Sequence, residues 1–211
     1  NTLLESIKNV ERWESESQKN QLLGEIYFLR AYSYFELCRM YGTVPLIISP
    51  EPVNNPRATP EKLYAQIASD LKSAITLMPS ISFGTSGAPE LGHATKWAAE
   101  ALIARVYLFY TGYYNKTELP LSEGGVITKQ NVIEWLSDCI ANSGHGLIDD
   151  FRNLWPYSNK YTSLDYKYAS DNELEWVGEG GTNEETVFAL KFSIRGNWTN
   201  IAHGNAVICY F

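Results

Sequence analysis

The pattern of hydrophobic and polar positions along the chain predicts four long helices. They cover residues 21–41, 60–78, 95–114 and 129–142, and a short amphipathic segment precedes them at 1–10. At about 100° per residue, the polar side chains of the first long helix gather on one arc of roughly 120°. Apolar side chains cover most of its remaining surface. We therefore expect this helix to pack against neighbours on two sides, as in a layered helical array.

Sequence signals at the helix ends support these boundaries. Thr59 and Thr128 are typical N-cap residues, and Pro60 fits the first position of a helix. Gly42 and Gly144 are residues at which helices commonly stop. The segments between these signals are predicted to be loops.

An internal repeat relates the first and third long helices. Four positions recur 73 residues later, which are Leu29, Ala31, Tyr34 and Tyr41 against Leu102, Ala104, Tyr107 and Tyr114. Each repeat is then a pair of helices with the long helix first. Because tetratricopeptide units repeat at about 34 residues, the pattern predicts tetratricopeptide-like pairs with enlarged loops.

The character of the sequence changes at about residue 149. The chain becomes aromatic and irregular there, and residues 185–194 alternate like a half-buried strand. The predicted fold is mainly α, with tetratricopeptide-like helical pairs at 1–148. A second, irregular and loop-rich region at 149–211 begins a short strand region.

Two charged residues fall within predicted apolar faces. Arg30 lies on the apolar side of the first long helix, and Asp70 lies about 20° from Leu63 inside the buried stripe of the second. A charge left alone in a core costs several kcal/mol, so we expect Arg30 and Asp70 to form a buried, structural ion pair. The alternative is that Arg30 binds an anionic ligand.

Other side chains are placed by the same helical geometry. Leu22 and Leu29 are expected on the buried side of the first long helix. In the third, Arg105 lies opposite Lys96 and Glu100, so we expect it on the packed side, with no equally clear partner.

Composition narrows the class of protein. With 45% hydrophobic and 19% charged residues, the 211-residue chain is typical of a globular protein. Its net charge of −7, with acidic and basic residues interspersed, argues against binding to nucleic acid, which requires clustered Lys and Arg. No apolar run approaches the roughly 20 residues of a membrane-spanning helix.

The chain is rich in aromatic residues, with six Trp and fourteen Tyr. Flat aromatic faces with nearby polar groups suit sugar ligands. The densest group follows the predicted helices and supplies the candidate ligand-binding residues Trp155, Tyr157, Asn159, Tyr161, Tyr166 and Tyr168. The alternative is that these rings pin an irregular loop onto the helices.

No motif indicates catalysis, a cofactor or a metal. The three histidines show no metal-ligand spacing, and the three cysteines form no CxxC motif. Phosphate loops, nucleophile motifs and Cys/His dyads are missing from the sequence. We expect Cys38 and Cys139, which fall within predicted helices, to be small buried thiols.

The segment that ends the first long helix carries a resemblance to a known family. Its residues Glu25, Phe28, Leu29, Arg30, Ala31, Tyr41, Gly42, Val44, Pro45 and Leu46 match a pattern of Glu, hydrophobic-Phe-Leu-Arg-Ala, Tyr-Gly and Val-Pro-Leu. Collinear matches follow at 57–79, 93–110 and 183–193. The chain thereby resembles the SusD/RagB family of Bacteroidetes surface lipoproteins. It departs from the family pattern at His93, where Arg is usual.

The resemblance implies a non-catalytic, nutrient-binding protein on the cell-surface side of the outer membrane. Its implied partner is a TonB-dependent, SusC-like transporter, and its contact with the membrane would be a lipid anchor outside this chain. The family is longer, so the chain is expected to be an internal fragment. An oligosaccharide is the favoured ligand. The alternatives are a peptide ligand, a protein-binding tetratricopeptide scaffold and, more distantly, a hydrolase.

Overall fold

The computed structural model describes residues 1–51, 54–86, 93–154, 167–174, 177 and 183–190. Its helices and strands are α1 (Thr2–Ser6), η1 (Ile7–Asn9), α2 (Glu16–Tyr41), α3 (Pro60–Leu77), α4 (Lys96–Tyr113), β1 (Leu119–Pro120), β2 (Val126–Ile127), α5 (Lys129–Asn142), η2 (Phe151–Leu154) and α6 (Lys167–Asp171). The prediction of a mainly helical fold is confirmed.

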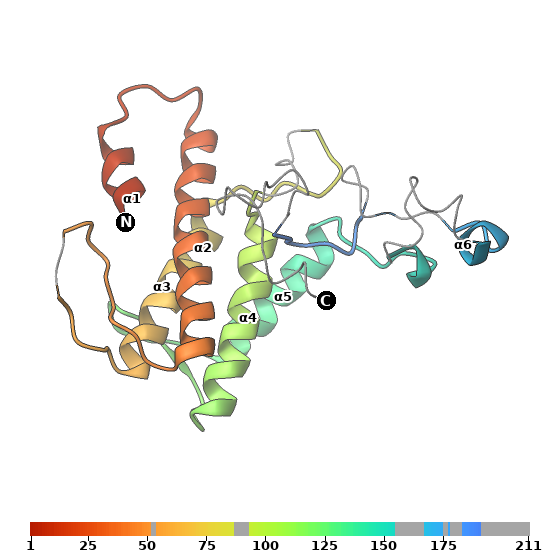
Figure 1. The fold of residues 1–211 in the computed structure, drawn as a ribbon. Coiled ribbons are helices and arrows are strands. Elements are labelled where there is room, and N and C mark those ends of the chain that lie inside the picture. Colours follow the sequence, from red (N-terminus) through yellow and green to blue (C-terminus); the bar gives the residue numbers. More distant parts are fainter. Residues whose placement is uncertain (52–53, 87–92, 155–166, 175–176, 178–182, 191–211) are drawn as a thin grey trace, which may run out of the picture.

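The four long helices pack in sequence order. Helix α2 lies on α3, α3 lies on α4, and α4 lies on α5, with a smaller contact between α2 and α4. Successive helices run in alternating directions (Figure 1). They therefore form the two antiparallel pairs that the sequence predicts, α2 with α3 and α4 with α5.

Each long helix begins at a hydroxyl side chain that accepts a hydrogen bond from a backbone N–H of the first turn. These N-cap residues are Ser15, Thr59, Thr95 and Thr128. Helix α2 begins five residues before the predicted boundary, because its first turn is polar and carries no apolar period. It ends at Gly42, whose φ of 74° favours glycine.

The buried side of α2 is narrower than predicted. Its buried residues follow a single helical stripe, which consists of Gly24, Phe28, Ala31, Phe35 and Cys38. Leu22 and Leu29 were expected to be buried but are 38% and 46% exposed. This expectation is wrong because α3 covers one face of α2, and the two leucines lie about 100–120° away from Phe28 around the helix.

Equivalent positions of the internal repeat lie on the first helix of each pair, but they are not always buried to the same extent. Ala31 and Ala104 are both buried, whereas Leu29 is exposed and Leu102 is buried. Helix α4 contacts α2, α3 and α5. It is consequently covered over more of its circumference than α2.

A two-stranded hairpin follows α4 and lies against α3. Leu119 pairs with Ile127 and Pro120 with Val126 in an antiparallel register, and both Leu119 and Ile127 are buried. The connecting turn includes Gly124, whose φ is 91°. This hairpin lies in a stretch that the sequence analysis left without regular structure.

The predicted strand at 185–194 is not formed in its described part. Residues 183–190 have no strand, and residues 191–194 lie outside the described residues. A strand needs a neighbouring strand to satisfy its backbone, and here the segment packs on α2 instead. The Phe188 ring lies 4.9 Å from that of Phe28 and 5.9 Å from that of Tyr32. The division into regions 1–148 and 149–211 stays a prediction.

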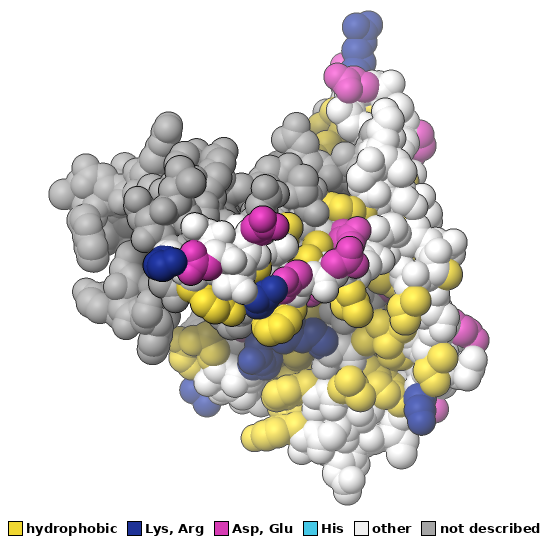
Figure 2. All heavy atoms as spheres, turned by 90° about the vertical axis from the view of Figure 1, so that its right-hand side faces the viewer, with side chains coloured by type: hydrophobic (Ala, Val, Ile, Leu, Met, Phe, Trp, Pro, Cys, Tyr) yellow, Lys and Arg dark blue, Asp and Glu magenta, His cyan; other side chains and the backbone are white. Residues whose placement is uncertain are grey.

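Figure 2 views the molecule from the right-hand side of Figure 1, and hydrophobic side chains are scattered over this face beside acidic and basic ones. Exposed apolar residues include Ile140 on α5 and Leu147 after it, at 81% and 84% exposed. In the part of the chain that the structure describes, no helix is long and apolar enough to cross a membrane.

Candidate ligand-binding site and buried ionic networks

The predicted partners Arg30 and Asp70 are in contact between α2 and α3. Arg30 donates two parallel hydrogen bonds to the carboxylate, from Nε to Oδ2 at 2.7 Å and from an Nη atom to Oδ1 at 2.6 Å. Their side chains are 13% and 3% exposed. This is the bidentate geometry in which an Arg–carboxylate pair is strongest.

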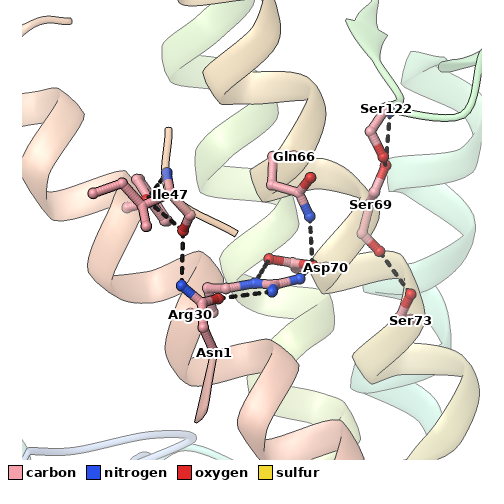
Figure 3. Close-up of polar contacts among 9 residues, drawn as sticks. Asn1, Arg30, Ile47, Gln66, Ser69, Asp70, Ser73 and Ser122 are labelled. Carbon is pink, nitrogen blue, oxygen red and sulfur yellow. Dashed lines mark hydrogen bonds and ion pairs between the residues drawn. The ribbon is translucent and has the colours of Figure 1, made fainter. Parts of the chain in front are cut away.

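Two further side chains complete this network (Figure 3). Gln66 donates to Asp70 Oδ1 at 2.9 Å, and Arg30 donates its other Nη group to Asn1 Oδ1 at 3.0 Å. Asn1 in turn donates to the carbonyl oxygen of Ile47 at 2.8 Å. The network therefore ties the N-terminal segment and the loop after α2 to the α2–α3 pair.

The charges of the pair are mutually supported. Hydrogen bonding to Asp70 raises the pKa of Arg30, so the guanidinium stays charged. Burial raises the pKa of Asp70, and the bonds from Arg30 oppose that effect. Each guanidinium nitrogen of Arg30 donates to a protein oxygen, which agrees with the structural ion pair that the sequence predicts.

A second buried carboxylate lies where α4 meets α5. Glu100 is 0% exposed, and neither of its carboxylate oxygens has a hydrogen bond with a described residue. Lys96 Nζ lies 3.6 Å from Glu100 Oε1 but 2.6 Å from Asp138 Oδ2. Burial raises the pKa of Glu100 to about 7, although Lys96 lowers it.

This arrangement corrects the expected orientation of α4. Arg105 was expected on the packed side and is exposed, whereas Lys96 and Glu100 face the core. Helix α4 is apolar over most of its circumference, so periodicity allows either charged side to face inward. The orientation of α4 about its own axis is decided by its contact with α5, where Asp138 accepts a hydrogen bond from Lys96.

Most of the predicted ligand-binding residues lie outside the described residues. These are Trp155, Tyr157, Asn159, Tyr161 and Tyr166. Tyr168 is described, on α6, and is 47% exposed. It lies beside Arg152, whose pKa is raised by hydrogen bonding to Asp150 and to Tyr168. Arg152 also donates to Asn172 Oδ1 at 3.2 Å.

The two described histidines each contact another part of the chain. His93 Nδ1 lies 2.9 Å from Glu25 Oε2 on α2, and His145 Nδ1 lies 2.9 Å from the carbonyl oxygen of Glu184. The His145 ring also stacks on Phe83 at 4.7 Å. No group of three or more metal-ligating side chains exists within the described ranges.

Comparison with known proteins decides the family. A family model described as "Starch-binding associating with outer membrane" matches residues 1–108, which is half of the chain. The chain belongs to the SusD-like family. By that description, the family binds starch and associates with the outer membrane.

Relatives of this SusD-like chain support the assignment along most of its length. It is 26% identical over 189 residues to a SusD-like protein of Bacteroides ovatus, a match covering 87% of this chain and 28% of that protein. A laminarin-binding SusD-like protein of known structure has a TM-score of 0.58 at 29% identity, over 76% of this chain and 32% of the other.

A SusD superfamily protein from Bacteroides fragilis shows the shared fold. Its TM-score is 0.64 at 24% identity, covering 92% of this chain and 34% of the other. The SusD-like chain thus spans about a third, or less, of the length of these relatives.

Several residues of the two networks were missed by the sequence analysis. Asn1 and Gln66 join the Arg30–Asp70 pair through the packing of separate elements, which no local pattern records. Glu100 could be recognised as an acidic residue in an apolar helix, but the sequence analysis placed it on the solvent-exposed side of that helix. Its spacing of four from Lys96 was the available signal.

Proposed function

We propose that the protein captures oligosaccharides at the cell surface and passes them to a TonB-dependent, SusC-like transporter in the outer membrane. Membership of the SusD-like family carries this proposal. A glycan ligand is favoured over a peptide by the 29% identity to a protein whose name states that it binds laminarin. We further infer that a lipid anchor outside this chain holds the protein at the membrane, and that it binds its ligand without cleaving it.

Calorimetric titration of the full-length protein tests the proposal directly. The ligands are laminarin oligosaccharides, malto-oligosaccharides and a peptide mixture, with chromatography of the sugars after incubation. We expect heat from at least one glycan series and no shortened products. Binding of peptides without any glycan response would favour a peptide-importing subunit, and binding of neither would favour a protein-binding scaffold.

The aromatic segment after residue 149 is the proposed place of ligand contact. One stacking ring contributes roughly 1 kcal/mol to binding, so Trp155→Ala should weaken glycan affinity several-fold. Trp155→Phe keeps a ring and should retain most of the affinity. If both variants bind glycan as tightly as the unmodified protein, the segment only packs against the helices, which is the alternative that the sequence analysis left open.

A further inference from the structure

A surface cleft of about 520 Å³ lies where α2, α3 and the β1–β2 turn meet. Its volume falls within the range of small-ligand sites, roughly 300–1,000 Å³. Its described walls come from residues 23–27, 69–77 and 121–124, which are not the aromatic residues that the sequence analysis proposed for ligand binding. The helical pair and the hairpin thus supply the described walls of the cleft.

One part of the cleft is apolar. Leu23 and Tyr27 lie one turn apart on α2, and Leu77 and Leu121 lie beside them. All four side chains are partly buried. A ligand in the cleft would therefore meet three aliphatic side chains and one aromatic ring, which is a surface suited to C–H groups.

The wall formed by α3 is polar. Ser69, Ser73 and Thr76 have the spacing of one helix face, and all three line the cleft. Ser73 Oγ donates to the carbonyl oxygen of Ser69 at 2.9 Å, and Thr76 Oγ1 donates to that of Lys72 at 2.9 Å. Since the hydroxyl protons of Ser73 and Thr76 are used within the helix, the lone pairs of these two oxygens remain able to accept a hydrogen bond from a ligand.

Two opposite charges flank these hydroxyls. Lys72 on α3 and Glu123 in the turn both line the cleft and are exposed, and the side chain of neither has an ion pair or hydrogen bond with a described residue. Lys72 supplies hydrogen-bond donors, and Glu123 supplies acceptors. Because the two charges balance, the cleft favours a neutral polar ligand over an anionic or cationic one.

The walls of the cleft are held in place by the polar contacts of Figure 3. Ser122 donates from both its backbone N–H and its hydroxyl to Ser69 Oγ, each at 2.8 Å, which fixes the turn on α3. On the opposite wall, the Arg30 guanidinium lies 5.6 Å from the centre of the Tyr27 ring. The cleft is thus largely formed before a ligand arrives, which lowers the entropic cost of binding.

We propose that this cleft is a binding subsite for a short stretch of neutral oligosaccharide. The C–H face of a sugar ring packs against Tyr27 and its aliphatic neighbours, while ring hydroxyls bond to Lys72, Glu123 and the α3 hydroxyls. This inference rests on the proposed function, since it names a second place on the same protein where the captured glycan is held.

Calorimetric titration of matched variants of the full-length protein tests the subsite. Lys72→Met and Glu123→Gln each remove one charged hydrogen-bonding group, and we expect each to weaken affinity for laminarin or malto-oligosaccharides about five- to ten-fold. Lys62→Met on the same helix and Glu118→Gln before the hairpin are the matched controls outside the cleft. These controls should bind like the unmodified protein.

Hydrogen exchange gives a second readout that needs no substitution. We expect the glycan to slow exchange of amides in residues 121–125 of the unmodified protein. Glycan binding that is equal in the cleft and control variants, without protection of the turn, would overturn the subsite and leave the proposed function standing. No glycan binding by the unmodified protein would overturn both.

Discussion

The two helical pairs each bury a carboxylate where helices meet, but only one of these carboxylates is fully hydrogen-bonded. Asp70 receives a bidentate bond from Arg30 on the neighbouring helix and a third bond from Gln66. The nearest cation to Glu100 among the described residues is Lys96, four residues earlier on its own helix, at 3.6 Å.

The difference comes from the direction in which each cation reaches. Arg30 crosses from α2 to α3 with a planar fork that matches the two oxygens of Asp70. Lys96 is a point charge shared between two carboxylates, and its shorter contact is the one to Asp138 on α5. The bonds from Arg30 therefore oppose the effect of burial on the pKa of Asp70, whereas burial raises the pKa of Glu100 to about 7.

Removing the acid from the first pair should have the largest effect. We expect Asp70→Ala to lower the free energy of unfolding by about 3–5 kcal/mol, because it leaves the Arg30 charge in a nearly buried position without its partner. Denaturant unfolding measures this loss. The double variant Arg30→Met with Asp70→Leu removes both charges and should be less destabilised than Asp70→Ala alone. A loss below about 1 kcal/mol for Asp70→Ala would show that the pair contributes little.

In the second helical pair, the stabilising contribution of the buried acid Glu100 should depend on pH. The pKa of Glu100 is about 7 in the folded chain against 4.5 when unperturbed. A raised pKa means that the folded state binds the proton more tightly, so its stabilising contribution is complete below pH 4.5. That contribution is lost as pH rises through about 7.

Glu100→Gln replaces the neutral acid with a neutral amide and should remove this pH dependence. Relative to the unmodified chain, we expect the variant to gain about 3 kcal/mol of unfolding free energy between pH 4 and pH 9. Denaturant unfolding at several pH values gives the difference directly. Parallel pH profiles for the two proteins would mean that Glu100 has the same pKa in the folded and the unfolded chain.

Glycines on the first helix of each pair offer a smaller test of how tightly the pairs are packed. A Cβ at Gly24 would overlap Met78 Cγ and lie 3.4 Å from the carbonyl oxygen of Ala74, whereas one at Gly112 meets nothing within 4 Å. We expect Gly24→Ala to cost about 1–2 kcal/mol through overpacking. Gly112→Ala should be neutral or add about 0.5 kcal/mol through helix propensity. Equal effects on thermal unfolding would contradict the close approach at Gly24.

The helices that could be predicted most accurately are those with explicit start and stop residues. The observed bounds Pro60–Leu77, Lys96–Tyr113 and Lys129–Asn142 lie within one residue of the predicted ones, because a capping Thr precedes each. The start of α2 was missed, since its polar first turn contains no periodic apolar residues. The two strands of the hairpin at 119–127 are too short to show the alternation of apolar and polar residues that predicts a strand.

The buried ionic networks were only partly predictable for a related reason. Arg30 and Asp70 are single charges within otherwise apolar stripes, so each one indicates a partner. Glu100 lies on a helix that is apolar nearly all round, where the rotation is decided by what packs against it. The candidate aromatic residues, Tyr168 apart, lie outside the described residues. The cleft between α2, α3 and the hairpin combines three segments distant in sequence, so no local pattern reveals it.

The buried cysteines allow the opening of the two helical pairs to be followed separately. Cys38 lies in α2 and Cys139 in α5, and burial raises the pKa of the first thiol to about 11 and that of the second above its usual range. Because the thiolate is the reactive form, a thiol reagent labels each residue only when its helix opens locally. With Cys209 replaced by Ser, the two labelling rates report the local opening free energy of one pair and then of the other within a single chain.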